Sequence, residues 1–165
     1  MLAVVRAWWV VPVLAAGFVA CSSSTSSSGQ SGGGDAGDDG VIGCNGDSRA
    51  ETYSAGMGQM GKSGVFKFVL DKSVPAPASA GSSLTWTLQI LDASGKPVDG
   101  ATFPVLHPWM PLHGHGTSQV MVTGGGNGTY TLAPLYFYMP GLWETDITAQ
   151  AGSEKDSTSF YFCMQ

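Results

Sequence analysis

A clear alternation of apolar and polar side chains within residues 84–91 constrains the fold more than any other feature of this chain. The sequence there is L-T-W-T-L-Q-I-L, which places Leu84, Trp86, Leu88 and Ile90 on one face of an extended segment. A period of two suits a strand that is buried on one side and solvated on the other. We therefore expect a sheet with one face in a hydrophobic core, and Trp86 within that core.

Short segments rich in β-branched and aromatic residues recur along the chain. They predict further strands at residues 65–70, 101–106, 119–123, 129–138, 143–149 and 157–163. Turn-forming residues separate them, as at 93–96 and 124–128. No segment shows a convincing helical period. The pattern predicts an all-β, immunoglobulin-like β-sandwich of seven to eight antiparallel strands, with a cupredoxin-like barrel as the alternative.

The first twenty residues have the form of an export signal. One positive charge, Arg6, precedes an apolar run that is shorter than a membrane-spanning helix usually requires. The run ends in F-V-A-C, which resembles the bacterial lipobox, with Phe18 in place of the usual leucine. This resemblance implies that residues 1–20 are a lipoprotein signal peptide and that Cys21 is lipidated. Ser22 then implies the outer membrane, facing the periplasm; ordinary cleavage with a free Cys21 is the alternative.

A polar tether separates the anchor from the folded part. Residues 21–40 consist almost entirely of Ser, Gly and Asp after the cysteine, so they predict a flexible linker, and the domain occupies residues 41–165. Without its signal peptide the chain has six basic and twelve acidic side chains, a net charge near −6. That charge argues against nucleic acid as a partner, and against electrostatic docking on anionic lipid. The membrane is then a partner through the lipid anchor.

The cysteine count fits an exported domain. With Cys21 assigned to lipid, Cys44 and Cys163 remain, one at each end of the folded part. An oxidising compartment favours a disulfide between them. A metal role is the rival, but neither cysteine has a Cys or His neighbour close in sequence.

All three histidines lie in residues 107–116, H-P-W-M-P-L-H-G-H-G. Imidazole and thioether groups are ligands for soft and borderline metals, copper above all. The prolines and glycines argue against a regular helix or central strand here, because proline lacks a ladder donor and glycine weakens ordered elements. We expect a loop or a broken edge strand. In an extended segment His113 and His115 project to one side, with Cα atoms about 6–7 Å apart.

Three segments together resemble the YtkA-like domain family of exported bacterial immunoglobulin-like domains. They are M-P-L-H-G-H-G at 110–116, G-N-G-T-Y-T-L at 126–132 and F-Y-M-P-G-L-W-E at 137–144. The resemblance covers roughly residues 63–150. The family is similar in turn to the FixH and CopC groups, which are associated with copper handling and cytochrome oxidase assembly.

The resemblance implies a metal site. The family's loop corresponds to Met110, His113 and His115 in this chain, and its downstream methionine corresponds to Met139. His107 and Trp109 are additions, and Leu112 stands where many relatives carry a polar residue. The residues leave a structural interpretation open, in which the histidines hold the loop through backbone hydrogen bonds. Met139 is equally well explained as a core methionine.

No catalytic constellation accompanies the loop. No nucleophile-elbow pattern surrounds a serine, no paired carboxylates mark a cleft, and no phosphate-binding glycine motif occurs. We therefore expect a non-enzymatic, periplasm-facing lipoprotein that binds copper or transfers it to an acceptor. The alternative is a structural or protein-interaction module of the envelope that holds no metal.

Overall fold

The computed structural model describes residue 44 and residues 47–165. The signal peptide expected at residues 1–20, the lipidation expected at Cys21 and the linker expected up to residue 40 lie outside these residues. The described part contains nine strands and no helix, so it holds no helical segment that could cross a membrane. The bounds are β1 Met57–Met60, β2 Phe66–Val74, β3 Ser82–Asp92, β4 Thr102–Met110, β5 His115–Gly116, β6 Met121–Gly126, β7 Thr129–Phe137, β8 Gly141–Ala151 and β9 Glu154–Met164.

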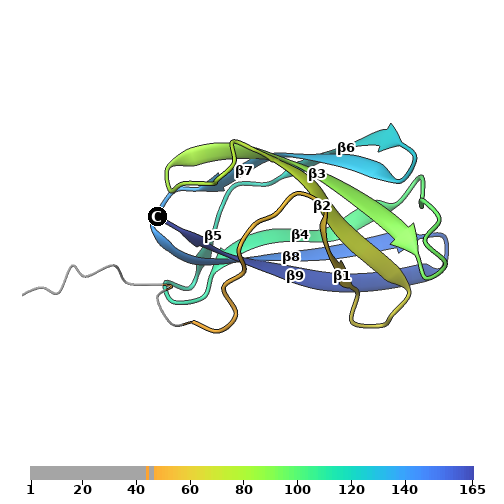
Figure 1. Ribbon diagram of the computed structural model, residues 1–165, viewed down its shortest axis with the longest axis horizontal. Coiled ribbons are helices and arrows are strands. Elements are labelled where there is room, and N and C mark those ends of the chain that lie inside the picture. The colour runs from red at the N-terminus through yellow and green to blue at the C-terminus, as the bar shows by residue number, and fades with distance from the viewer. Residues whose placement is uncertain (1–43, 45–46) are drawn as a thin grey trace, which may run out of the picture. The chain divides into compact units, whose positions relative to one another are not determined.

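The strands form two antiparallel sheets that face each other (Figure 1). One sheet has the order β1-β2-β3-β7-β6 and the other the order β5-β4-β8-β9. The chain passes from one sheet to the other three times, after β3, β5 and β7. The expected all-β sandwich is confirmed, with nine strands instead of seven or eight.

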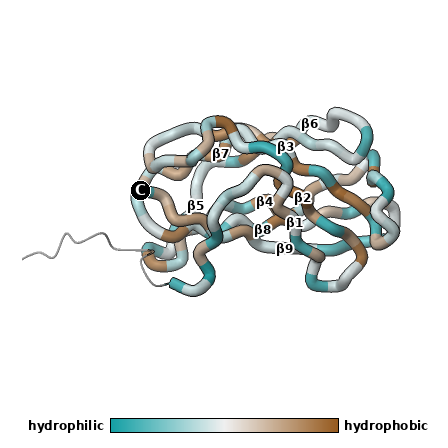
Figure 2. Tube along the Cα trace, in the orientation of Figure 1, coloured by the Kyte–Doolittle hydropathy of each residue, from teal (hydrophilic) through white to brown (hydrophobic). Residues whose placement is uncertain are grey.

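The alternating residues of β3 place one face of the strand in the core, as predicted. Leu84, Leu88 and Ile90 are fully buried and Trp86 is 2% exposed. Hydrophobic and hydrophilic positions likewise succeed one another along β2 (Figure 2), where Phe66, Phe68 and Leu70 face inward. Strands β7, β8 and β9 supply the remaining large side chains, chiefly Leu132, Phe137, Trp143, Ile147 and Phe160.

Of the two alternatives for residues 107–116, a loop or a broken edge strand, the structure has the broken edge strand, and the strand predicted at 101–106 extends further than expected. Strand β4 continues to Met110, because it pairs with β8 on one side and lies along the sheet's edge over most of its length. An edge strand tolerates Pro108, whose missing N–H would otherwise leave a gap in the ladder. The glycines of 124–126 also belong to a strand, β6, so the turn there is shorter than predicted.

The predicted disulfide is present between Cys44 and Cys163. It joins the segment before β1 to the penultimate residue of β9. Glu51 strengthens the same junction, since its N–H donates to the carbonyl of Tyr161 (2.8 Å) and its carboxylate accepts from the N–H of Tyr161 (2.9 Å). The N-terminal segment of the domain is thus fixed along β9.

Candidate functional site

A tight hairpin between β4 and β5 positions the histidine-rich segment. Met110 pairs with His115 and Trp109 with Gly116, so only residues 111–114 form the turn. The carbonyl of Met110 accepts from the N–H groups of His113 (3.1 Å) and Gly114 (2.9 Å). Gly114 has φ 66°, a left-handed conformation that glycine adopts without the steric cost of a side chain.

The register of this hairpin separates the histidines. Residues that pair directly in a sheet point to the same face, and successive residues point to opposite faces. His115 therefore shares the inner face with its partner Met110, which is fully buried in the core. His107 lies on the outer face, where its ring contacts that of Trp109 at 5.2 Å between centroids. A Cβ added at Gly116 would lie 2.7 Å from Nε2 of His107, so the imidazole of His107 lies directly over that glycine.

His113 and His115 come together at the hairpin tip. Their ring centroids are 5.7 Å apart, with an interplanar angle of 57°. Two imidazoles that bind one ion through nitrogens about 2 Å away place their centroids roughly 5–6 Å apart. The observed separation matches this requirement, although the turn at Gly114, and not an extended segment, brings the rings together.

Tyr138, which follows β7, is a site residue that the sequence did not reveal. Its ring stacks on His115 at 5.2 Å and 19°, and its hydroxyl lies 2.7 Å from Nδ1 of His115. The direction of this hydrogen bond depends on the imidazole tautomer. When Nδ1–H donates to the tyrosine oxygen, the lone pair on Nε2 is available to a ligand, the arrangement by which a second group orients a metal-binding histidine. The only hint in the sequence is its place directly before Met139.

The two methionines lie at the same end of the sandwich. Met110 is opposite His115 in the hairpin and is fully buried in the core. Met139 is partly buried and packs against the core, and its carbonyl accepts from Nε1 of Trp143 at 2.9 Å. Trp143 in turn contacts His115 at 5.9 Å between centroids. The structure thus brings His113 and His115 together, pairs Met110 with His115 in the hairpin, and relates Met139 to His115 only through Trp143.

The hairpin and the segment that carries Tyr138 and Met139 contribute no Asp, Glu, Lys or Arg to the site. Residues 101–143 contain no Asp, Glu, Lys or Arg. Among residues 44 and 47–165, no three His, Cys, Asp or Glu side chains gather closely enough to hold an ion by themselves. Binding here would depend on two imidazoles and on thioether sulfur. Neutral ligands leave the full charge of an ion uncompensated, so a monovalent soft cation fits them better than a divalent one.

A family model described as YtkA-like matches residues 61–148. The match begins after β1 and ends within β8, so it includes the hairpin, Tyr138 and Met139 and omits β9 and both cysteines of the disulfide. No curated protein and no solved structure matches the chain.

Proposed function

Because the chain belongs to the YtkA-like family, we propose that it is a copper-binding envelope lipoprotein whose site is formed by His113 and His115. The observation that carries this proposal is the 5.7 Å separation of their rings at an accessible hairpin tip. His113 is exposed and His115 half-buried, so an ion reaches one imidazole from solvent and the other at the margin of the core.

The neutral surroundings favour Cu(I). Two imidazoles supply nitrogen ligands, and the thioether of Met139 or Met110 supplies the sulfur that Cu(I) prefers. Two or three neutral ligands leave the ion open to a fourth group from outside. Transfer to an acceptor protein then proceeds by ligand exchange, with the exposed His113 released first. A lipid on Cys21 would hold this domain at the outer membrane, facing the periplasm, and the protein has no catalytic role.

One observation favours the competing function, a structural or protein-interaction module without metal. The hydrogen bond and ring stack between Tyr138 and His115 give that histidine a partner in the absence of any ion. On this account the hairpin tip, with Leu112 61% exposed, would contact another envelope protein directly.

Titration with Cu(I) against a chromophoric chelator separates the two functions. We expect one-to-one binding by the full chain, and a loss of affinity of at least about 100-fold in the double variant His113→Ala, His115→Ala, because both nitrogen ligands are removed. His107→Ala is the matched control, since that histidine lies on the other face of the hairpin, and it should bind as the unmodified chain does. Equal affinity in the double variant and the unmodified chain would exclude the site.

A further inference from the structure

Each of the two sheets has two free margins, and the structure protects three of these four against pairing with another chain. The strand at a margin presents a row of unpaired N–H and C=O groups, to which a strand from another molecule can bind. β1 has only four residues, and β4 carries Pro104 and Pro108 before β5 pairs with its end. A very short strand and prolines are two of the usual protections of a margin.

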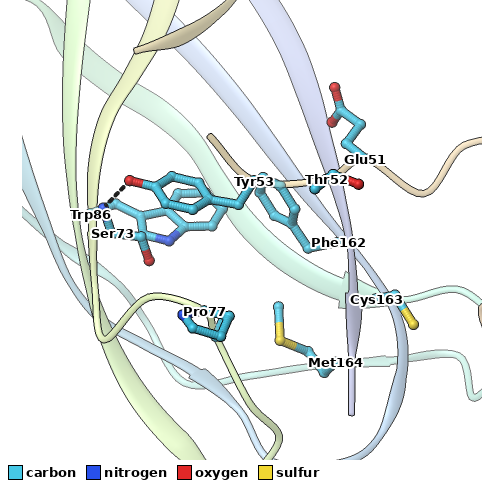
Figure 3. A pocket seen from close by; sticks show the side chains of 10 residues that line it. Glu51, Thr52, Tyr53, Ser73, Pro77, Trp86, Phe162, Cys163 and Met164 are labelled. Carbon is cyan, nitrogen blue, oxygen red and sulfur yellow. Dashed lines mark hydrogen bonds between the residues drawn. The ribbon is translucent and has the colours of Figure 1, made fainter. Parts of the chain in front are cut away.

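The margin at β9 is covered by the segment before β1. Glu51 forms a parallel bridge with Phe162, and the N–H of Lys62 donates to the carbonyl of Ser157 at 2.8 Å. Figure 3 shows Glu51 and Tyr53 on this segment beside Phe162 of β9. The backbone of β9 is therefore already paired at both ends of the strand.

The margin at β6 has no such protection. β6 is the outermost strand of its sheet (Figure 1), and its backbone groups directed away from β7 have no partner within residues 44 and 47–165. Its sequence, M-V-T-G-G-G, contains no charged residue and no proline. Met121 is 69% exposed, more than any other large apolar side chain in the described domain. β6 is thus the margin at which another strand can pair.

Two glycines of β6 are not required by the fold. Neither Gly124 nor Gly125 has a left-handed φ, and a Cβ at either would meet no heavy atom closer than 3.6 Å. Gly126 differs, because its φ of 78° favours glycine. A glycine inside a strand weakens it, and often marks a place where another backbone approaches closely. No such approach comes from the described part of the chain, so Gly124 and Gly125 point to a second molecule.

The sequence of β6 is complementary to itself. In a two-fold antiparallel pairing centred on Thr123, this residue lies opposite Thr123 of the second copy, Val122 opposite Gly124, and Met121 opposite Gly125. Each large side chain then has a glycine across from it, over which it can extend. A threonine pair is a favourable cross-strand contact. We propose that the protein forms a two-fold dimer in which the β6 strands of two copies pair and join their five-stranded sheets.

A groove beside β6 provides space for the second copy. The groove has a volume of about 440 Å³ and lies between β6 and the start of β4, where Phe103, Val122, Gly124 and Tyr130 line it. Val122 and Gly124 lie on the inner face of the sheet, since they pair with the buried Leu132 and Tyr130. Val122 of the second copy, opposite Gly124, therefore enters this groove.

The charge distribution also favours contact between two copies at this margin. β4, β6 and β7 all lie within residues 101–143, which contain no Asp, Glu, Lys or Arg. The net negative charge of the chain is carried elsewhere, so two copies can meet along β6 without like charges in contact. The contact includes neither His113 nor His115, and it is independent of the function proposed above.

Light scattering of the full chain over a range of concentrations tests the dimer. We expect the mass to rise from one chain to two, and Thr123→Lys to raise the dissociation constant at least tenfold, because it places like charges opposite each other. Thr131→Lys is the matched control, since the exposed Thr131 pairs with Thr123 but lies one strand further from the second copy. A mass of one chain up to about 1 mM, or equal dissociation constants for Thr123→Lys and the unmodified chain, would overturn the proposal.

Introduced cysteines test the pairing itself. Directly opposed residues have Cα atoms about 4.5–5.5 Å apart, which a disulfide can span, so Thr123→Cys should crosslink two copies under mild oxidation. In Thr131→Cys the two introduced thiols are separated by three strand spacings of about 4.8 Å, so no crosslink beyond that of the unmodified chain should form. A crosslink in both variants, or in neither, would contradict the pairing of β6 with itself.

Discussion

Tyr138 is the residue on which the organisation of the histidine site depends most. Its hydroxyl fixes Nδ1 of His115, and its ring limits the orientations of the imidazole. A metal-binding histidine that lacks such a partner has more orientations to lose on binding, so the partner contributes to affinity without touching the ion.

Replacement of Tyr138 by phenylalanine should lower the Cu(I) affinity by roughly tenfold, because it removes the hydrogen bond and retains the stacked ring. Competition with a chelator measures the change. Tyr136→Phe is the control, since Tyr136 stacks on Tyr138 and has no hydrogen bond to His115. Equal losses in the two variants would show that the hydroxyl of Tyr138 does not orient His115.

Asp156 illustrates a buried charge with a purely structural role. The residue is 2% exposed, and its carboxylate accepts hydrogen bonds from the backbone N–H groups of Ser63, Val65, Phe66 and Ser157. Burial by itself would raise the pKa of Asp156, but these four donors outweigh it and the pKa is lowered. The carboxylate thereby holds the turn between β1 and β2 against the start of β9.

Asp156→Ala should therefore reduce the free energy of unfolding at neutral pH by roughly 3 kcal/mol or more, because several buried donors lose their acceptor. Asp71→Ala, at an exposed position, should have little effect. Denaturant titrations measure both.

The Asp156 contribution also has a definite pH dependence. A carboxyl whose pKa is depressed in the folded state stabilises above its unfolded pKa of about 4, and this stabilisation is lost as pH falls through the folded pKa. The stability difference between the unmodified chain and Asp156→Ala should hence narrow below pH 4. A constant difference from pH 7 to pH 2 would contradict a lowered pKa.

At the scale of single elements, the sequence predicted what depends on local pattern. β3 was predicted because its alternation is regular from Leu84 to Ile90, and β8 and β9 because their segments are rich in β-branched and aromatic residues. β1 and β5 were missed, because one lies in a glycine-rich segment and the other is a two-residue strand that exists only through its pairing with β4.

The candidate site was predictable in composition and not in arrangement. Residues 107–116 identified the histidines, but their faces depend on the register between β4 and β5, and a shift of one residue would exchange them. The same argument applies to Tyr138, which reaches His115 across 23 positions of sequence.

The β6–β7 hairpin contains two glycines, Gly126 and Gly128, whose replacement by alanine distinguishes a conformational cost from a steric cost in the free energy of unfolding. Gly126 and Gly128 both have left-handed φ values, of 78° and 67°. A Cβ at Gly126 would meet nothing within 4 Å, whereas one at Gly128 would lie 2.6 Å from the carbonyl oxygen of Ile90. Gly126→Ala should thus cost about 1 kcal/mol of unfolding free energy, the conformational term alone.

Gly128→Ala should cost more than about 2 kcal/mol, because the backbone of β3 must also move. Thermal or denaturant unfolding of the two variants gives the comparison. A Gly128→Ala variant no less stable than Gly126→Ala would mean that β3 does not approach the turn so closely.

At the scale of the whole domain, the disulfide joins two cysteines 119 positions apart and closes a loop that contains β1 to β8 and nearly all of β9. Such a crosslink restricts the unfolded chain and should stabilise by about 2–4 kcal/mol. Denaturation with and without reductant measures this, and the oxidised chain should contain no free thiol at Cys44 or Cys163. A reactive thiol at either position, or equal stability in the two states, would contradict this role.

The most direct test of the proposed function is X-ray absorption at the copper edge of the chain loaded with one equivalent of Cu(I). Two imidazoles and one thioether should give scattering from two histidine rings and from one sulfur atom. The imidazole signal should vanish in the His113→Ala, His115→Ala variant and persist in His107→Ala. A spectrum without imidazole scattering, or one that the double substitution leaves unchanged, would contradict a copper site at the hairpin.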